Sequence, residues 1–219
     1  MSQDLWTAVD RYITDLLVPA DPALEAALHA TAEAGMPAIA VSPAQGKLLM
    51  LLAQMQGARK ILEIGTLGAY STIWLARGLV GGGRLITLEA NPKHADVAQS
   101  NIARAGLADV VDLRVGRAIE TLPTLLHEAP FDLIFIDADK VSYPEYLSWA
   151  IKLSGPGSVI IADNVVRDGA VIDAESSDPN VQAVRRFNEL LTAETRLTAT
   201  TIQTVGSKGY DGFTIARHL

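Results

Sequence analysis

The chain has 219 residues, of which 49% are hydrophobic and 20% charged, so it has the length of one large domain with a substantial core. Its 25 acidic and 18 basic residues give a net charge of −7, and the basic residues are scattered, which argues against a nucleic-acid partner. The lack of cysteine excludes disulfides and thiolate catalysis and fits a reducing, cytoplasmic location. Apolar stretches are broken well before the roughly 20 residues of a membrane-spanning helix, so we expect no membrane segment.

The first 57 residues predict three helices. The first is amphipathic and its apolar stripe requires a cover, because apolar residues recur at helical spacing at Leu5, Val9, Ile13 and Leu16. The other two begin at Asp21-Pro22 and Ser42-Pro43, where a capping side chain precedes a proline. Gln45 occupies the capping-box position of the third helix. We expect these two helices to end near Gly35 and Gly57.

Beyond residue 60, short β-branched runs alternate with helical patterns, which is typical of parallel β-α-β units. Helix starts between the strands are visible at Asn91-Pro92 and from Ser142 to Glu145. The sequence therefore predicts an α/β fold whose consecutive strands cover residues 60–64, 84–88, 110–115, 131–137 and 157–162.

The C-terminal part predicts a helix followed by a β-hairpin. The helix begins at Asp178-Pro179 and carries a core-facing stripe of Val181, Val184, Phe187 and Leu191. Strand-like runs at 197–205 and 210–217 surround a glycine-containing turn, which predicts an antiparallel hairpin in an otherwise parallel sheet. Residues 165–177 lack a strong period and predict a loop over the site. We find no linker composition, so we expect one domain over residues 1–219, with helices over 1–57 and an α/β core over 58–219.

A strand, a glycine turn and a helix follow one another over residues 61–71, an arrangement in which backbone approaches a nucleotide-type ligand. The turn contains Gly65 and Gly68. Glu63 stands where a dinucleotide motif has its first glycine, so contact with a pyrophosphate is compromised and a cationic ligand is favoured. Glu89 ends the next strand, where an acid can accept hydrogen bonds from both ribose hydroxyls of an adenosine. An ordinary strand-to-helix turn with a solvated Glu89 remains the alternative.

Two apolar strands end in oxygen-bearing side chains, Asp137 after one and Asp163 with Asn164 after the other. Ligands of open parallel sheets bind at the carboxyl ends of the strands, so these three side chains are expected to converge. Carboxylate and amide oxygens suit Mg²⁺, Ca²⁺ or Mn²⁺, with free positions for water and substrate. Taken singly, Asp163-Asn164 could form an Asx turn and Asp137 a helix cap.

Lys140 follows the first of these strands and is the candidate proton acceptor, because the ammonium form is disfavoured beside a dication. A solvated surface amine is the alternative for Lys140. Asp139 is either a supporting group or part of a solvated loop. The four histidines lack ligand spacing and are expected at the surface: His29, His94, His127 and His218.

Taken together, these residues resemble the cation-dependent class I O-methyltransferases, which include caffeoyl-CoA and catechol O-methyltransferases and bacterial relatives. Six motifs in order, spread over most of the chain, carry the resemblance: 41–46 (VSPAQG), 63–71 (EIGTLGAYS), 88–90 (LEA), 115–118 (VGRA), 136–140 (IDADK) and 162–164 (ADN).

The resemblance implies a Rossmann-like sheet of seven strands, mostly parallel, with a C-terminal antiparallel hairpin and helices on both faces. It implies metal binding by Asp137, Asp163 and Asn164, and catalysis by Lys140 together with Asp137 and Asn164. The family commonly forms homodimers, so the amphipathic first helix is expected at that interface or over the active site. The implied S-adenosylmethionine contacts are Val41, Glu63, Gly65, Thr66, Ser71, Glu89, Ala118 and Asp137.

We therefore expect transfer of a methyl group from S-adenosylmethionine to a hydroxyl of a small acceptor. A catechol is favoured, because two adjacent oxygens can chelate the open metal positions. Residues 35–39 and 165–177 show no match to a plant-type CoA-ester pocket. An NAD-dependent oxidoreductase and a non-catalytic S-adenosylmethionine-binding protein are the alternatives.

Overall fold

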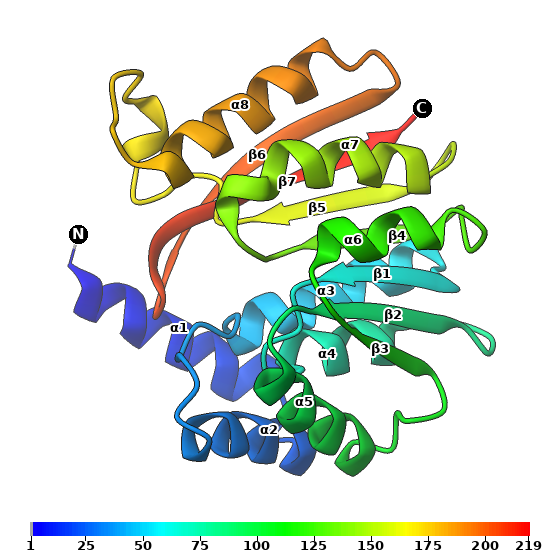
Figure 1. Ribbon diagram of the computed structural model, residues 1–219. Helices are drawn as coiled ribbons and strands as arrows, with labels where there is room; N and C mark the ends of the chain where they lie inside the picture. Colours follow the sequence, from blue (N-terminus) through cyan, green and yellow to red (C-terminus); the bar gives the residue numbers. More distant parts are fainter. Residues whose placement is uncertain (1) are drawn as a thin grey trace.

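The computed structural model describes residues 2–219 and has the predicted α/β architecture (Figure 1). Seven strands form one sheet: β1 (Lys60–Ile64), β2 (Arg84–Glu89), β3 (Val111–Val115), β4 (Leu133–Ile136), β5 (Val159–Asp163), β6 (Leu197–Gly206) and β7 (Gly209–His218). The helices are α1 (Gln3–Leu17), α2 (Pro22–Glu33), α3 (Pro43–Gln56), α4 (Tyr70–Gly78), α5 (Pro92–Arg104), α6 (Ala118–Thr121), α7 (Tyr143–Leu153) and α8 (Pro179–Ala193). Short 3₁₀ turns are η1 (Leu122–Leu125), η2 (Lys140–Ser142) and η3 (Ala170–Ile172).

The strand order is β3-β2-β1-β4-β5-β7-β6. The two pairings of β7, with β5 and with β6, are antiparallel, and the other pairings are parallel. The order changes direction between β1 and β4, which pair in parallel. Ligands of such sheets bind outside the carboxyl ends of the strands at this change of direction. The predicted seven-stranded sheet with its C-terminal hairpin is confirmed.

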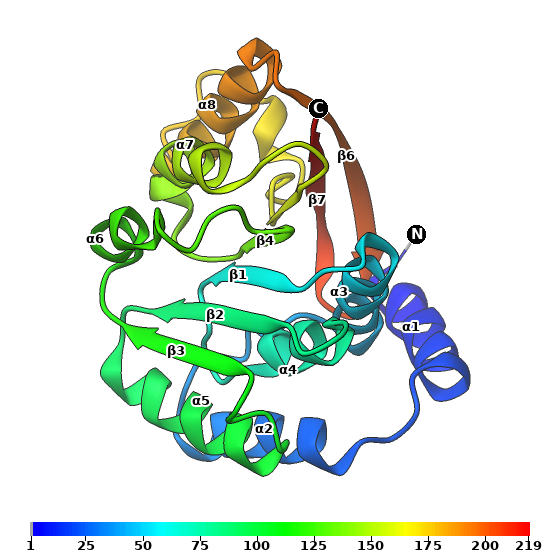
Figure 2. The same cartoon turned by 90° about the vertical axis from the view of Figure 1, so that its right-hand side faces the viewer.

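Helices cover both faces of the sheet and bury a separate apolar cluster on each (Figure 2). On one face α6, η1, α7 and α8 pack over residues such as Ile134 and Ile160. On the other face α2, α3, α4 and α5 pack over Ile61 and Phe135. Val181, Val184 and Phe187 of α8 are buried as the stripe predicts. The central strands are apolar on both sides because helices cover both faces.

The predicted helix starts are present in the structure. The side chains of Asp21, Ser42, Asn91 and Asp178 accept hydrogen bonds from the first turns of α2, α3, α5 and α8, each followed by proline. The capping box of α3 forms only in part, because the Gln45 side chain donates to Asp163 instead of returning to the cap. Gln45, which was expected to form a hydrogen bond at the start of its own helix, therefore binds Asp163 at the edge of the sheet.

Strand β4 is shorter than predicted. Asp132 precedes it, and one carboxylate oxygen of Asp132 accepts hydrogen bonds from the backbone N–H groups of Arg59 and Lys60, both at 2.8 Å. Asp137 follows the strand, and its N–H still donates to the carbonyl of Ile64 at 2.9 Å. The apolar run therefore includes residues that join neighbouring strands without belonging to β4.

Helix α1 lies beside α3 and the edge strand β6 and buries none of its residues (Figures 1 and 2). Its large apolar side chains stay accessible, including Tyr12 at 68% and Leu16 at 65% exposure. The apolar stripe predicted for this segment is therefore not covered by residues 2–219. None of the helices described has the length and hydropathy needed to cross a membrane.

Asp21 joins helix α2 to helix α4. It caps α2 through the amides of Ala23 and Leu24, and it also pairs with Arg77 at 2.5 Å and 3.1 Å. The pKa of the Asp21 carboxyl is lowered, chiefly by the hydrogen bond from Arg77. We predict that Asp21→Ala lowers the free energy of unfolding by about 2 kcal/mol, because it removes a cap and a two-bond ion pair.

Asp178→Ala is the matched control, because Asp178 caps α8 without contacting an arginine. Loss of this cap alone is expected to cost about 1 kcal/mol. Urea unfolding of both variants at neutral pH measures the difference. Equal losses would show that the Arg77 pair contributes nothing to stability.

Candidate active site

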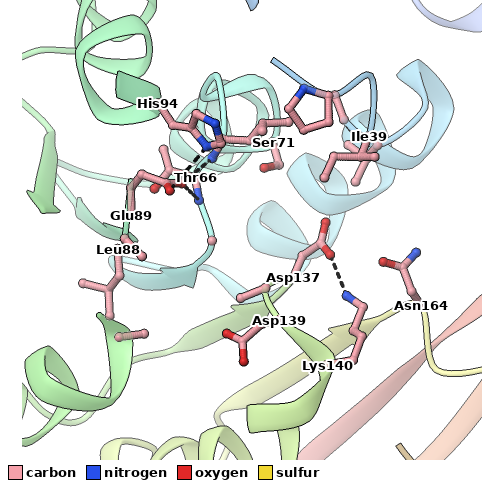
Figure 3. A pocket seen from close by; sticks show the side chains of 18 of the residues that line it. Ile39, Thr66, Ser71, Leu88, Glu89, His94, Asp137, Asp139, Lys140 and Asn164 are labelled. Atoms are coloured by element: carbon pink, nitrogen blue, oxygen red, sulfur yellow. Dashed lines mark hydrogen bonds and ion pairs between the residues drawn. The ribbon is translucent and has the colours of Figure 1, made fainter. Parts of the chain in front are cut away.

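The carboxyl ends of β1, β2, β4 and β5 border a cavity of about 510 Å³ (Figure 3). Glu89 and His94 lie at one end of the cavity, Asp137 lies near the middle and Asn164 at the other end. The cavity is lined by Pro37, Ile39, Ala40, Val41, Gly65, Thr66, Leu67, Tyr70, Ser71, Leu88, Glu89, Ala90, His94, Ala118, Asp137, Ala138, Asp139, Lys140, Tyr146, Asn164 and Arg167.

The turn after β1 brings backbone to the cavity. Gly65 has φ +99°, and a Cβ there would lie 2.0 Å from the carbonyl oxygen of Asp137. Only glycine fits this position, because both the dihedral angle and the contact exclude a side chain. Leu67 and Ala69 also have positive φ, at 51° and 67°. The chain thus turns sharply between β1 and α4 and leaves its backbone accessible to a ligand.

Glu89 at the end of β2 is held in place by backbone amides. One carboxylate oxygen accepts from Thr66 N at 3.3 Å and Leu67 N at 2.8 Å, and the other accepts from Asn91 N at 2.9 Å. His94 Nδ1 lies 3.5 Å from the second oxygen. The carboxylate lines the cavity in a fixed orientation, and one of its about four acceptor positions remains free for a ligand hydroxyl.

Glu63 does not line the cavity. Its side chain is fully buried and accepts hydrogen bonds from the hydroxyls of Ser71, Thr72 and Thr87 at 2.5 to 2.7 Å. Burial raises its pKa to about 7, although the three hydroxyls oppose the shift. Glu63 therefore ties β1 to β2 and α4, and of these partners only Ser71 reaches the cavity.

Asp137 and Lys140 form an ion pair in the cavity wall, with Nζ 3.0 Å from Oδ1. Lys140 also donates to the hydroxyl of Tyr143 at 2.6 Å. Tyr143 is fully buried and donates in turn to the backbone carbonyls of Ile136 and Asp163. The ammonium group is thus positioned by one carboxylate and one phenol, both fixed to strand ends.

Asp163 directly precedes Asn164 in the chain, and only 5% of it is exposed. Its two oxygens accept from Asn164 N at 2.9 Å and from Gln45 Nε2 at 2.7 Å. Burial, followed by the negative charge of Asp137, raises the pKa of Asp163 to about 7. Asp163 borders a second cavity of about 280 Å³, and Asn164 lines both cavities.

The donor set at this edge fits a hard divalent cation. The Asp163 carboxylate, whose pKa is raised by burial and by the charge of Asp137, forms with Asp137 and the Asn164 amide an oxygen-rich group that a cation would stabilise. Among residues 2–219 no three His, Cys, Asp or Glu side chains gather as a metal site, so a cation at this edge would need the Asn164 amide as a ligand beside the two carboxylates. Asn164 stands in the left-handed region at φ 56°, a conformation that asparagine tolerates.

The structure brings together most of the residues predicted for the site. Lys140 and Asn164 line the larger cavity. So do the implied cofactor residues other than Glu63, namely Val41, Gly65, Thr66, Ser71, Glu89, Ala118 and Asp137. Asp139 also lines it and accepts hydrogen bonds from Tyr146 and Ser142. A supporting role for Asp139 thus has a structural basis.

The histidine prediction is wrong at two of its four positions. His29 and His127 are exposed, but His94 lines the cavity, and His218 in β7 is buried and bonded to Ser154. Sequence spacing tests only whether histidines can share a metal, so it misses a single histidine such as His94 in the first turn of α5. Arg167, Tyr146 and Gln45 were missed too, because only folding brings them to this edge.

The buried carboxyl of Glu63 makes stability depend on pH. Its pKa lies near 7 in the folded protein and near 4.5 when unfolded, so its ionisation penalty is absent below pH 4.5 and complete above pH 7. The stability associated with the protonated form is lost as the pH rises through this window. We predict that Glu63→Gln gains stability relative to wild type by up to about 3 kcal/mol between pH 4.5 and 7.5.

Urea unfolding of both proteins across this range measures the change, and the comparison cancels the titration of Asp163. Glu89→Gln serves as a control, because Glu89 is held by backbone amides at the cavity surface. Parallel stability curves for wild type and Glu63→Gln would contradict the prediction.

Comparison with known proteins identifies the fold and the family. A catechol O-methyltransferase of Niastella koreensis is 58% identical over 218 residues and covers 99% of each chain. An O-methyltransferase of Bacillus cereus, solved with S-adenosylhomocysteine, superposes with a TM-score of 0.98 at 60% identity and full coverage of both chains. An O-methyltransferase of Streptomyces achromogenes involved in tomaymycin synthesis, solved with S-adenosylmethionine, gives a TM-score of 0.96 at 53% identity, covering 100% of this chain and 99% of that one.

These relatives support neither the NAD-dependent nor the non-catalytic alternative. The profile of the O-methyltransferase family matches residues 17–219, almost the whole chain. The protein therefore belongs to this family and is an S-adenosylmethionine-dependent O-methyltransferase.

Proposed function

We propose that this enzyme methylates one hydroxyl of a catechol-like acceptor with the help of a divalent cation, most simply Mg²⁺. The observation that carries the proposal is the oxygen-donor group formed by Asp137, Asp163 and Asn164 beside Lys140. The catechol O-methyltransferase of Niastella koreensis supports the choice of acceptor through its name and its 58% identity.

In this proposal Asp137, Asp163 and Asn164 hold the cation. When bound, a cation at these residues would favour the deprotonated form of a catechol hydroxyl. Asp137 contributes the accessible carboxylate, since it lines the larger cavity. The side chain of Gln45 and the backbone N–H of Asn164 both donate to the buried Asp163 carboxylate and fix its orientation. The arrangement suits an acceptor with two adjacent oxygens.

The cofactor is assigned to the other end of the same cavity. Glu89 is suited to the ribose hydroxyls, because backbone amides already orient its carboxylate. Thr66 and Ser71 lie on the Glu89 side of the cavity (Figure 3), and Gly65, Val41 and Ala118 also line it. We assign Glu63 to holding Ser71 in position, through the 2.6 Å hydrogen bond between their side chains. S-Adenosylmethionine supplies the methyl group when bound.

Lys140 is assigned as the proton acceptor of the reaction. Its Nζ is positioned by Asp137 and Tyr143, and the side chain is only about a tenth exposed. The ammonium form of Lys140 would be disfavoured beside a bound cation, and the neutral amine could then take up the hydroxyl proton. The acceptor oxygen would attack the methyl carbon as the bond from that carbon to sulfur breaks, with S-adenosylhomocysteine as the leaving group. No covalent enzyme intermediate is required, so alignment of donor and acceptor supplies much of the rate.

Methyl transfer to a catechol, measured with labelled S-adenosylmethionine, tests this function. We predict that Asp137→Ala lowers turnover at least about a thousand-fold, since it removes a metal ligand. Lys140→Met is expected to lower kcat by about a hundred- to ten-thousand-fold while the protein still binds Mg²⁺. Asp96→Asn is the control, because Asp96 is exposed on α5 and does not line the cavity, so this variant should retain Mg²⁺-dependent turnover.

Calorimetry with S-adenosylmethionine accompanies the kinetics. Asp137→Ala should still bind the cofactor, which shows that the pocket has formed. Full activity of the wild-type enzyme in a chelator would overturn the metal-dependent mechanism. Activity on monohydroxylated acceptors equal to that on catechols would overturn the acceptor assignment.

We also propose that the enzyme acts as a homodimer, in which a second copy covers α1 and β6. Strand β6 is an edge strand of ten residues whose side chains are almost all exposed. Long accessible edges promote unwanted pairing unless something covers them. Apolar side chains of the neighbouring α1 extend this surface, since Leu16 of α1 is 65% exposed and Val205 of β6 is 50% exposed.

We further propose the cytoplasmic location expected from the sequence. The lack of cysteine fits a reducing compartment of this kind.

Sedimentation measures the oligomeric state. We predict a dimer for the wild-type protein and a monomer for Leu16→Asp, because the new charge would be buried in an apolar interface. Leu126→Asp is the control, since Leu126 is 53% exposed after η1, on the other face of the sheet. A monomeric wild-type protein, or equal dissociation of both variants, would contradict the proposal.

A further inference from the structure

Arg167 is a cation in the cavity wall that the proposed chemistry does not use. It lies three residues after Asn164 and lines the same cavity. Burial raises the pKa of Tyr143 well above its usual value, and Arg167 is the cation whose charge opposes this shift. The guanidinium charge therefore acts at Tyr143, the residue that accepts a hydrogen bond from Lys140.

One nitrogen of the guanidinium lacks a partner in the part of the chain that the structure describes. Arg167 Nε is buried and has no hydrogen-bond partner among residues 2–219. The nearby carboxylates are already engaged: Asp137 pairs with Lys140, and Asp139 accepts from Tyr146 and Ser142. A buried guanidinium donor without a partner is costly, so a ligand anion that pairs with it would remove that cost.

The backbone around Arg167 is held in an unfavourable conformation. Arg167 and Asp168 both have positive φ, at 57° and 54°, a region that such residues rarely adopt. One carboxylate oxygen of Asp211 in β7 accepts from the amides of Val166 and Arg167 at 2.9 and 3.0 Å. The hairpin therefore fixes this turn. Strained backbone that the surrounding structure maintains is found most often at ligand-binding positions.

We propose that Arg167 binds a carboxylate on the acceptor, so that the preferred substrates are catechols carrying an acidic group. The inference rests on the proposed function, because it places the acceptor beside Asp137 and Asn164. An arginine fork suits a planar carboxylate through paired hydrogen bonds. Asp137 and Asp139 line the same cavity and would repel a larger polyanion, which favours a single carboxylate.

Two isosteric acceptors test the proposal, namely 3,4-dihydroxybenzoate and its neutral analogue 3,4-dihydroxybenzamide. The wild-type enzyme with Mg²⁺ should prefer the benzoate. Arg167→Gln should lower kcat/KM for the benzoate by about ten- to a hundred-fold, mainly through KM, and leave the benzamide nearly unchanged. Arg167→Lys should be intermediate, since it keeps the charge without the fork.

Arg186→Gln is the matched control, because it removes an arginine that pairs with Glu189 on the exposed face of α8. Dissociation constants of the benzoate and of S-adenosylhomocysteine, measured by calorimetry with Mg²⁺, give a readout that needs no turnover. The benzoate should bind more weakly to Arg167→Gln, while S-adenosylhomocysteine binds as to wild type.

Three results would overturn the inference: no preference for the benzoate in the wild-type enzyme, equal losses for both acceptors in Arg167→Gln, or weaker S-adenosylhomocysteine binding in that variant. The wild-type comparison holds even if a variant folds poorly. Arg167-dependent binding of the benzoate without methylation of any catechol would refute the proposed function and retain the anion site. Methylation of catechols without Arg167-dependent binding would do the reverse.

Discussion

The close approach of two backbone segments, at Gly65 and Asp137, is the constraint on which the site depends. Parallel pairing of β1 with β4 brings these strand ends together, and the Asp137 amide donates to the carbonyl of Ile64. A Cβ at Gly65 would meet the Asp137 carbonyl oxygen at 2.0 Å. The turn after β1 and the proposed metal edge therefore share one wall, so in the proposed function methyl donor and acceptor meet in a single cavity.

Buried charge is handled in two different ways within this edge. Glu63 is fully buried and surrounded by three hydroxyls, so it acts as a structural tie that can remain protonated. Asp163 is nearly as buried but faces Asp137, whose negative charge adds to the effect of burial. One carboxylate is satisfied by the protein alone, whereas the other belongs to a group that a cation would complete.

Local patterns were enough to predict the order and type of the elements. Proline after a capping residue marked the starts of α2, α3, α5 and α8, and apolar runs marked the strands. The ends of β4 could not be predicted, because Asp132 and Asp137 join neighbouring strands through hydrogen bonds that depend on sheet pairing. The accessibility of α1 was equally unpredictable, since an amphipathic stripe does not show what covers it.

The sequence by itself determined which residue types end each strand, and hence that Glu89, Asp137 and Asn164 would meet at one edge of a parallel sheet. The motifs were enough to predict this meeting, because these residues lie at the end of a strand or directly after it. Only the tertiary structure decided which way each side chain points, turning Glu63 into the core and Gln45 toward Asp163, and placing His94 and Arg167 in the cavity wall. These outcomes depend on contacts between segments far apart in the chain, which no local pattern records.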